Sequence, residues 1–295
     1  MQIAQLEQSG KYEITTSFVE AAGARIAVHR SGSGPAIVGL HAIGHSARDF
    51  HGLMRRFADS HAVVAIDWPG HGDSPNDVKP VSADRYAEVL VDLLRILNLG
   101  RAVLVGNSVG GAAAIKAAAD QPAMVRALIL CDPAGLQRVG FVSRLYCRSK
   151  ARFFAKGERG DPGFAHQFRR YYERSVLTEP AASARREETI ASGYKVAPAL
   201  RQAWQSFAEQ AADIRALTPR LQCSVLYAWA RKDRIVAFSR CKEAVAATPQ
   251  HEVVMFDESH TAFLEQPGKF EAAMAAFLQG IPGEQHRQAA SAGAR

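Results

Sequence analysis

Short apolar runs alternate along this chain with stretches of helical spacing, and this alternation constrains the fold more than any other feature. Strands joined through helices pair in parallel, because each helix carries the chain back to the same end of the sheet. A parallel sheet is covered on both faces, and its strands are continuously apolar. The predicted strands, of which the first two form an antiparallel pair, are residues 12–20, 25–30, 36–41, 62–67, 102–105, 127–131, 224–230 and 252–256.

The helices are predicted from apolar residues that recur every three or four positions. The clearest one begins near Ser82 and presents one apolar face, and Gly100 is placed to end it. Three further helices are predicted. One begins near Ser46, one follows the segment GNSVGG and ends near Ala119, and one covers residues 262–279. Together with the strands they predict an α/β fold with a mostly parallel sheet and helices on both faces.

The alternation stops after residue 135 and resumes near residue 216, with only helical spacing between. The sequence therefore predicts a core domain formed by residues 1–136 and 216–281 and a helical cap inserted at residues 137–215. Residues 282–295 have no hydrophobic period and are predicted to be a disordered tail. The first residues lack the pattern of a secretory signal and no apolar run is long enough for a membrane span, so we expect a cytoplasmic protein that does not bind membranes.

The positive charge of the chain is concentrated in the predicted cap. The whole chain has 36 Lys and Arg against 29 Asp and Glu, whereas residues 137–215 alone have fifteen basic and eight acidic residues. No nucleic-acid motif accompanies this charge, so nucleic acid is not an expected partner. The first interpretation is an amphipathic cap whose basic stems reach water. The aromatic residues expected to face the cleft are Phe141, Tyr146, Phe153, Phe154, Phe168, Tyr171 and Tyr172.

The second interpretation of the basic cap is electrostatic selection. Arginines such as Arg148 and Arg170 would bind a carboxylate of the substrate, or an acidic carrier protein would dock on the cap.

The four cysteines show no metal-site spacing and are predicted to be free buried thiols. The segment GSG within residues 31–35 precedes a strand instead of following one, so it predicts a turn and not a dinucleotide-binding loop. No metal and no cofactor is expected.

The segment from Gly106 to Gly110 follows a predicted strand and opens a predicted helix. So sharp a turn forces its central residue into strained backbone geometry, and side chains at the two glycines would collide with neighbouring elements. Ser108 is thereby predicted to stand above the sheet edge, where helix N-terminal amides such as that of Val109 stabilise an oxyanion. The pattern indicates a nucleophilic serine; the alternative is a loop that only caps a helix.

A nucleophilic serine needs a base, and in an open parallel sheet functional residues gather at the carboxyl ends of strands. His260 lies just beyond the last predicted strand, and Asp233 lies just past the strand before it. The order Ser108, Asp233, His260 is the one expected for a nucleophile on a strand-turn-helix elbow.

Three other acidic residues follow strands. Asp132 is the reserve acid for the histidine, although capping the segment DPAG is its first interpretation. Asp257 and Glu258 stand too close to His260 in sequence to orient it and are interpreted as solvated turn residues.

The loop HAIGH after the third predicted strand is expected to supply a second oxyanion donor, the backbone N–H of Ile43. His41 and His45 suggest a metal pair, but no acidic partner is expected nearby, so His41 is interpreted as holding the loop. His41 and Asn107 are also candidates for substrate contact. His71 is interpreted as a turn residue.

The segments HAIG, DWPGHGDS, GNSVGG, RKDRIV and SHTAFLEQP together resemble the motifs of the α/β-hydrolase superfamily, in the order that the family has them. The resemblance covers residues 24–280. It implies an eight-stranded, mostly parallel sheet with a helical lid inserted after the sixth strand. It also implies five site roles: a catalytic triad of Ser108, Asp233 and His260, and oxyanion-hole amides of Ile43 and Val109.

Serine at the elbow argues against haloalkane dehalogenases and epoxide hydrolases, which use Asp there. GNSVGGAAA and LILCDPAGL resemble the meta-cleavage-product hydrolases, which break carbon-carbon bonds in acidic dienoates. This chain departs from them at HAIGHS, where they have a Gly-rich loop, and at Thr261, where they usually have Trp. The resemblance therefore favours hydrolysis of a small carboxylic ester or acidic substrate through an acyl-enzyme. The alternatives are cleavage of an oxo-dienoate and a non-catalytic ligand-binding role.

Overall fold

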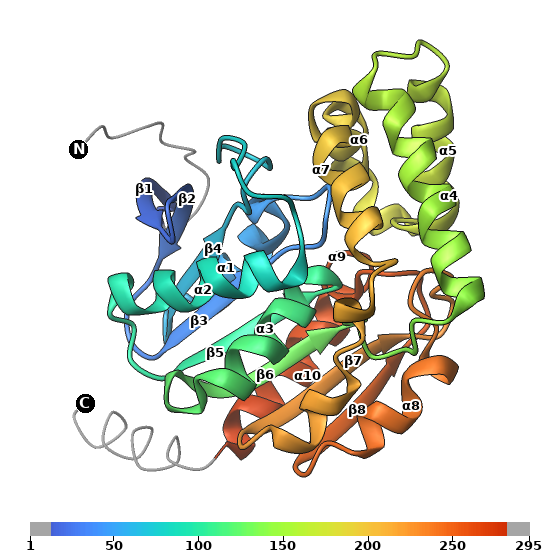
Figure 1. The fold of residues 1–295 in the computed structure, drawn as a ribbon. Helices are drawn as coiled ribbons and strands as arrows, with labels where there is room; N and C mark the ends of the chain where they lie inside the picture. Colours follow the sequence, from blue (N-terminus) through green and yellow to red (C-terminus); the bar gives the residue numbers. More distant parts are fainter. Residues whose placement is uncertain (1–12, 282–295) are drawn as a thin grey trace, which may run out of the picture.

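A computed structural model describes residues 13–281, in which the strands form one sheet in the order β1-β2-β4-β3-β5-β6-β7-β8 (Figure 1). The strands are β1 (Thr15–Ala21), β2 (Ala24–Ser31), β3 (Ala36–Leu40), β4 (Ala62–Ile66), β5 (Ala102–Asn107), β6 (Val125–Cys131), β7 (Ser224–Ala230) and β8 (His251–Phe256).

The sheet is mixed at one edge and parallel elsewhere. Strand β2 pairs antiparallel with both β1 and β4, and every other neighbouring pair is parallel. All residues of β3 and β5 are buried, as expected for strands covered on both faces. The predicted eight-stranded, mostly parallel α/β sheet is confirmed.

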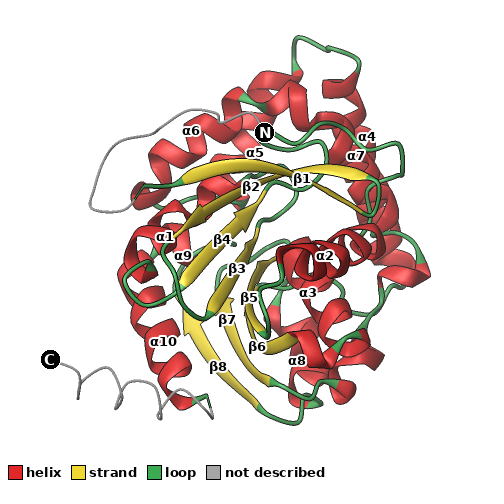
Figure 2. Ribbon diagram, turned by 90° about the vertical axis from the view of Figure 1, so that its left-hand side faces the viewer, coloured by secondary structure: helices red, strands yellow, loops and turns green. Residues whose placement is uncertain are grey.

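Helices cover both faces of this sheet (Figure 2). On one face lie α2 (Ala83–Leu97), α3 (Val109–Asp120) and α8 (Phe238–Ala246). On the other lie α1 (His51–Phe57), α9 (Ala262–Glu265) and α10 (Pro267–Gly280). Each face carries its own apolar cluster, because alternate residues of every strand point to opposite sides.

Two predicted helix ends were wrong. Helix α2 ends at Asn98, which takes the left-handed conformation with φ of 47°, so Gly100 lies beyond the end. Asparagine tolerates this conformation better than other side chains, which is the signal that was missed. The single helix predicted over residues 262–279 is two helices, because Pro267 starts a new one and its ring cannot continue the first.

Between β6 and β7 the chain forms four α-helices beyond the carboxyl ends of the parallel strands (Figure 1). They are α4 (Phe141–Glu158), α5 (Phe164–Ser175), α6 (Ser183–Ala191) and α7 (Gly193–Ser206). Phe154, Phe164 and Phe168 pack together and are fully buried. Phe141 was expected to face the cleft, but 82% of it is exposed.

The division into a core and a cap at residues 137–215 stays a prediction, and the tail predicted at 282–295 lies outside the described residues. None of the helices within residues 13–281 combines the length and apolar character needed to cross a bilayer. All four cysteines are free and buried, as predicted.

Candidate active site

Ser108 occupies the turn between β5 and α3 with φ of 54° and ψ of −115°, a strained conformation for a residue with a side chain. The neighbouring glycines make this turn possible. A Cβ on Gly106 would lie 2.7 Å from the Cα of Gly111, and one on Gly110 would lie 2.2 Å from the carbonyl oxygen of Leu40. The strain predicted at Ser108, and the collisions predicted at both glycines, are therefore present.

Backbone hydrogen bonds hold the turn in place. The N–H of Ser108 donates to the carbonyl of Cys131 at 3.0 Å, and the carbonyl of Ser108 accepts from Ala134 at 2.9 Å. Val109 is the first residue of α3, where a backbone N–H has no acceptor inside its own helix. This amide therefore points out of the helix end beside the serine.

His260 and Asp233 are brought together by the loops after β8 and β7. Nδ1 of His260 donates to Oδ2 of Asp233 at 2.7 Å. The other carboxylate oxygen of Asp233 accepts the N–H groups of Ile235 at 2.6 Å and Val236 at 3.0 Å, which fixes the carboxylate. Burial works against the charged imidazole, but the charge and hydrogen bond of Asp233, together with the charge of Glu265, raise the pKa of His260.

Ser108 and His260 line one cavity of about 70 Å³, together with Ile43 of the HAIGH loop. Most of its wall is apolar, and helices α4, α5 and α7 contribute aromatic rings. These rings belong to Tyr146, Tyr171, Tyr172 and Trp204. The cavity thus lies between the serine elbow and the helices that follow β6.

Four residues predicted to contact substrate do not line this cavity. Arg148 and Arg170 are exposed on the outer surface of α4 and α5. The side-chain amide of Asn107 donates to the carbonyls of Cys131 and His260, at 3.0 and 3.1 Å. Asn107 thereby ties the histidine loop to the elbow. The fourth, His41, lies in the loop described next.

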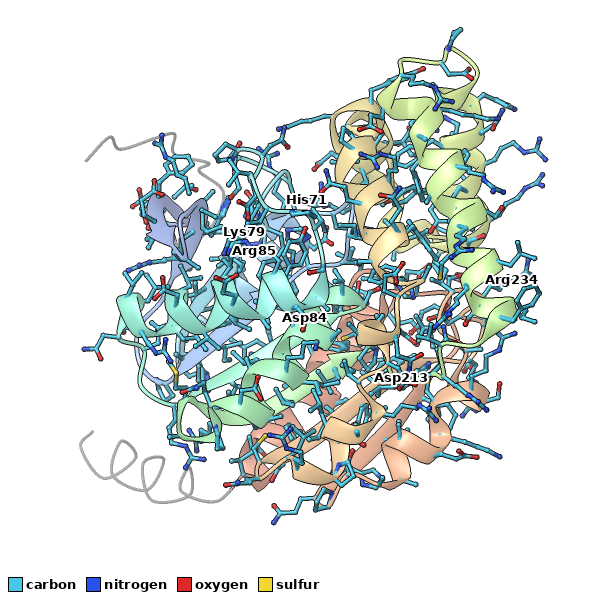
Figure 3. The ribbon with its side chains drawn as sticks, viewed as in Figure 1. His71, Lys79, Asp84, Arg85, Asp213 and Arg234 are labelled. Atoms are coloured by element: carbon cyan, nitrogen blue, oxygen red, sulfur yellow. The ribbon has the colours of Figure 1, made fainter. Side chains whose placement is uncertain are left out.

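Two histidines fix the loop that carries Ile43. The ring nitrogen Nε2 of His41 accepts the N–H of Trp68 at 2.9 Å, and Nε2 of His71 accepts the N–H of Gly44 at 2.9 Å. Burial lowers the pKa of His41 to about 4 and that of His71 to about 3, so both rings stay neutral and can accept. Figure 3 shows His71 where the loop after β4 approaches α7, whose Lys195 donates to the carbonyl of Gly72 at 2.6 Å. His71 was interpreted only as a turn residue.

His45 has the acidic partner that was not expected. Its Nδ1 donates to Asp49, four residues later, at 2.7 Å, and Arg185 of α6 donates to the same carboxylate at 2.6 Å. Arg185 also donates to the hydroxyl of Ser46 at 2.7 Å. Burial opposes ionisation of Asp49, but His45 and Arg185 hold its pKa well below the ordinary value. Through Ser46 and Asp49, Arg185 joins the helices after β6 to the HAIGHS loop and to the short 3-10 helix that follows it.

The role of Glu265 beside His260 was not predicted. Glu265 accepts the N–H groups of Thr178 and Glu179 on one oxygen and those of Ser259, His260 and Thr261 on the other. It therefore ties the histidine loop to the segment between α5 and α6. Its place in the first turn of the helix that follows Thr261 was the available signal, because the amides at a helix N-terminus have no acceptor within the helix.

The interpretation of Glu258 as a solvated residue was wrong. Its side chain is fully buried, and neither carboxyl oxygen has a hydrogen-bond partner within residues 13–281. Burial, followed by the charge of Glu265, raises its pKa to about 8. Asp257, its neighbour, is exposed as predicted.

Two clusters have the residue types of a metal site. In each, one ligand atom per residue lies within 4.8 Å of the others: Asp132 with Asp233 and His260, and His29 with Asp67 and Asp73. Asp233 and His260 already bind each other. Asp67 accepts the N–H groups of Ala47 and Asp73, so it clamps two loops. No metal is needed to explain these contacts of the two clusters.

The sequence model of the alpha/beta hydrolase fold family matches residues 35–267. A 2-(acetamidomethylene)succinate hydrolase of Mesorhizobium japonicum is 36% identical over 105 residues, which are 36% of this chain and 38% of the relative. The alignments with such curated relatives span about two fifths of their length.

Solved structures with the same fold cover nearly the whole chain. An esterase from Thermogutta terrifontis is 21% identical with a TM-score of 0.76, covering 90% of this chain and 98% of its own. The 2-hydroxy-6-oxo-6-phenylhexa-2,4-dienoate hydrolase of Rhodococcus strain RHA1 is also 21% identical with a TM-score of 0.76, covering 92% and 100%. At this identity the similarity concerns the fold.

Proposed function

The chain belongs to the alpha/beta hydrolase fold family, and from this premise we propose that it hydrolyses a small carboxylic ester through an acyl-enzyme. One observation carries the proposal: the strained elbow presents Ser108 to the same cavity as His260, whose ring is oriented by Asp233 at 2.7 Å. This combination of a nucleophile, a base and an oriented third group is what serine hydrolysis requires.

In the proposed mechanism His260 keeps its Nδ1 proton on the hydrogen bond to Asp233, which leaves Nε2 as the base. His260 takes the proton of Ser108 as the serine oxygen attacks the ester carbonyl. The backbone amides of Ile43 and Val109 stabilise the oxyanion, and His260 then protonates the leaving alcohol. Water, activated by the same histidine, releases the acid.

The chemistry of the cavity wall supports a small, largely apolar acyl or alcohol group. Tyrosine and tryptophan rings form much of the wall, and the free space of about 70 Å³ is small. Among the residues that line the cavity, Arg138 carries a permanent positive charge. The succinate named in the substrate of the Mesorhizobium relative makes an acidic ester a reasonable member of the substrate panel.

A second candidate is cleavage of the carbon-carbon bond of an oxo-dienoate by the same three residues. It is favoured by the Asn107-Ser108 pair and by the shared fold with the Rhodococcus dienoate hydrolase. A panel of chromogenic esters, with and without a distal carboxylate, beside a coloured dienoate separates the candidates. Ester turnover without loss of the dienoate colour supports the first; the reverse result supports the second.

Labelling by a fluorophosphonate probe tests the nucleophile directly. We expect the wild type to be labelled and Ser108→Ala not to be labelled. Ser143→Ala is the matched control, because Ser143 also lines the cavity but its hydroxyl donates to the carbonyl of Gly140 at 2.9 Å. Absence of labelling in the wild type would overturn the enzyme proposal and favour a ligand-binding role.

A further inference from the structure

Two carboxyl groups, not one, lie behind His260. Asp132 follows β6 and Asp233 follows β7, and these strands are neighbours in the sheet. One oxygen of each carboxyl group and a ring nitrogen of His260 all lie within 4.8 Å of one another. Both aspartates are buried. Adjacent parallel strands therefore deliver two acids to the same histidine.

The hydrogen bonds around the pair differ between the two aspartates. Asp233 accepts from two amides on one oxygen and from His260 on the other, so it is bonded as a carboxylate. Asp132 accepts the N–H of Ala230 at 2.9 Å on Oδ1. Its Oδ2 is buried and has no hydrogen-bond donor among the described residues. A proton on that oxygen would make it a donor instead.

The charges around Asp132 also favour a proton on it. Two carboxyl groups this close and this deeply buried cannot both ionise without a large repulsion. Burial and then the charge of Asp233 raise the pKa of Asp132 well above the ordinary value. The thiols of Cys131 and Cys241 both interact electrostatically with Asp132, and burial raises their pKa values, so both are neutral.

We propose that Asp132 is a neutral carboxylic acid that donates a hydrogen bond from Oδ2 to Asp233, and so is a positioning residue for the His260 partner. The proposal rests on the proposed hydrolase function for its catalytic consequence. The donated bond leaves the negative charge on Asp233, where His260 uses it, and removes the repulsion that a second carboxylate would create. If Asp233 loses its charge, Asp132 can ionise and return a negative charge to the histidine.

The backbone of Asp132 makes a matched variant available. Its φ of 43° is left-handed, a conformation that Asn adopts more readily than most residues. Asp132→Asn keeps Oδ1 as the acceptor for Ala230 and places an N–H where the proposed O–H stands. Asp132→Ala keeps neither group. The first variant reproduces a neutral donor, and the second removes it.

The kinetic test measures labelling rate and ester turnover against pH. Asp132→Asn should stay within about threefold of the wild type with an unchanged acid limb, and Asp132→Ala should lose at least about tenfold. Asp233→Asn should lose activity but regain part of it as pH rises. The double variant Asp132→Asn/Asp233→Asn should lack that pH-dependent recovery.

Two kinetic results would overturn the proposal. A loss in Asp132→Asn as large as in Asp233→Asn, with the acid limb moved to lower pH, would show that Asp132 is ionised. Equal profiles for Asp233→Asn and the double variant would show that Asp132 does not replace the lost charge.

An infrared measurement decides the protonation state without catalysis, so it remains informative if fluorophosphonate labelling refutes the hydrolase proposal. The carbonyl band of a protonated carboxyl group should be present near neutral pH and disappear in Asp132→Asn. The reference protein and the Asp132→Asn variant both carry Glu258→Gln, because Glu258 also keeps its proton near neutral pH and would add its own band. An unchanged spectrum would overturn the assignment of the proton to Asp132.

Discussion

Replacing Glu265 by Gln tests whether one buried carboxylate holds the histidine loop against the segment between α5 and α6. Its Oε1 accepts from Thr178 at 2.6 Å and Glu179 at 3.1 Å. Its Oε2 accepts three longer bonds from Ser259, His260 and Thr261, at 3.2, 3.2 and 3.4 Å. Glutamine has one acceptor oxygen, which we expect to stay on the shorter bonds.

Three buried amides of the histidine loop would then face an NH₂ group that cannot accept. Each hydrogen bond of this kind contributes roughly 1 kcal/mol net. The free energy of unfolding of Glu265→Gln should therefore fall by about 2–4 kcal/mol. Because the charge of Glu265 also raises the pKa of His260, the midpoint of the acid limb of kcat/KM should move to lower pH in the variant.

The assay is urea denaturation followed by tryptophan fluorescence, with the pH profile of ester turnover measured in parallel. Glu258→Gln is the matched control: Glu258 is equally buried, but its carboxyl group has no partner within residues 13–281 and keeps its proton at pH 7. We expect this control to lose no stability, because a neutral side chain replaces a neutral one. Equal losses in the two variants would refute the role given to Glu265.

Three further outcomes are expected. Glu258 keeps its proton to about pH 8 in the folded protein, whereas in the unfolded chain it loses the proton near roughly pH 4.3. The free energy of unfolding of the wild type should therefore fall as pH rises through this range. Urea denaturation between about pH 5 and 8 should show Glu258→Gln becoming more stable relative to the wild type as pH rises. Gly110→Ala should abolish probe labelling or folding, since its Cβ would meet backbone at 2.2 Å, whereas Gly52→Ala meets nothing and should leave both intact. The rise of kcat/KM with pH should have its midpoint above about 6.5, because His260 must be neutral to act as the base, and the double variant Asp132→Asn/Asp233→Asn, which has neither charge, should lower that midpoint.

Local patterns predicted the parts of the site that depend on short stretches of chain. The strand, turn and helix around Ser108 require glycine at fixed positions, so the elbow could be predicted from five residues. The positions of Asp233 and His260 after successive strands brought them to one edge, since parallel strands end together. The contact between them at 2.7 Å follows from that topology.

Residues that act through distant partners were predicted poorly. Glu258 and Asp257 are adjacent and alike in sequence, yet one is buried and the other exposed. The bond between Asp49 and Arg185 joins residues far apart in the chain, and no local pattern pairs them. Arg148 and Arg170 lie on the outer faces of their helices, which the helical period alone could not assign to cleft or solvent.

The alternating fold, the serine elbow and the order of nucleophile, acid and base could be predicted from the amino-acid sequence, because they depend on backbone geometry and on apolar periodicity within short segments. How the basic helices sit over the sheet, which arginine reaches the cavity, and the meeting of Asp132 and Asp233 behind one histidine became known from the folded chain. Such encounters depend on the packing of segments separated by many residues. Burial and hydrogen bonding, which set the charge state of each acid, arise only from that packing.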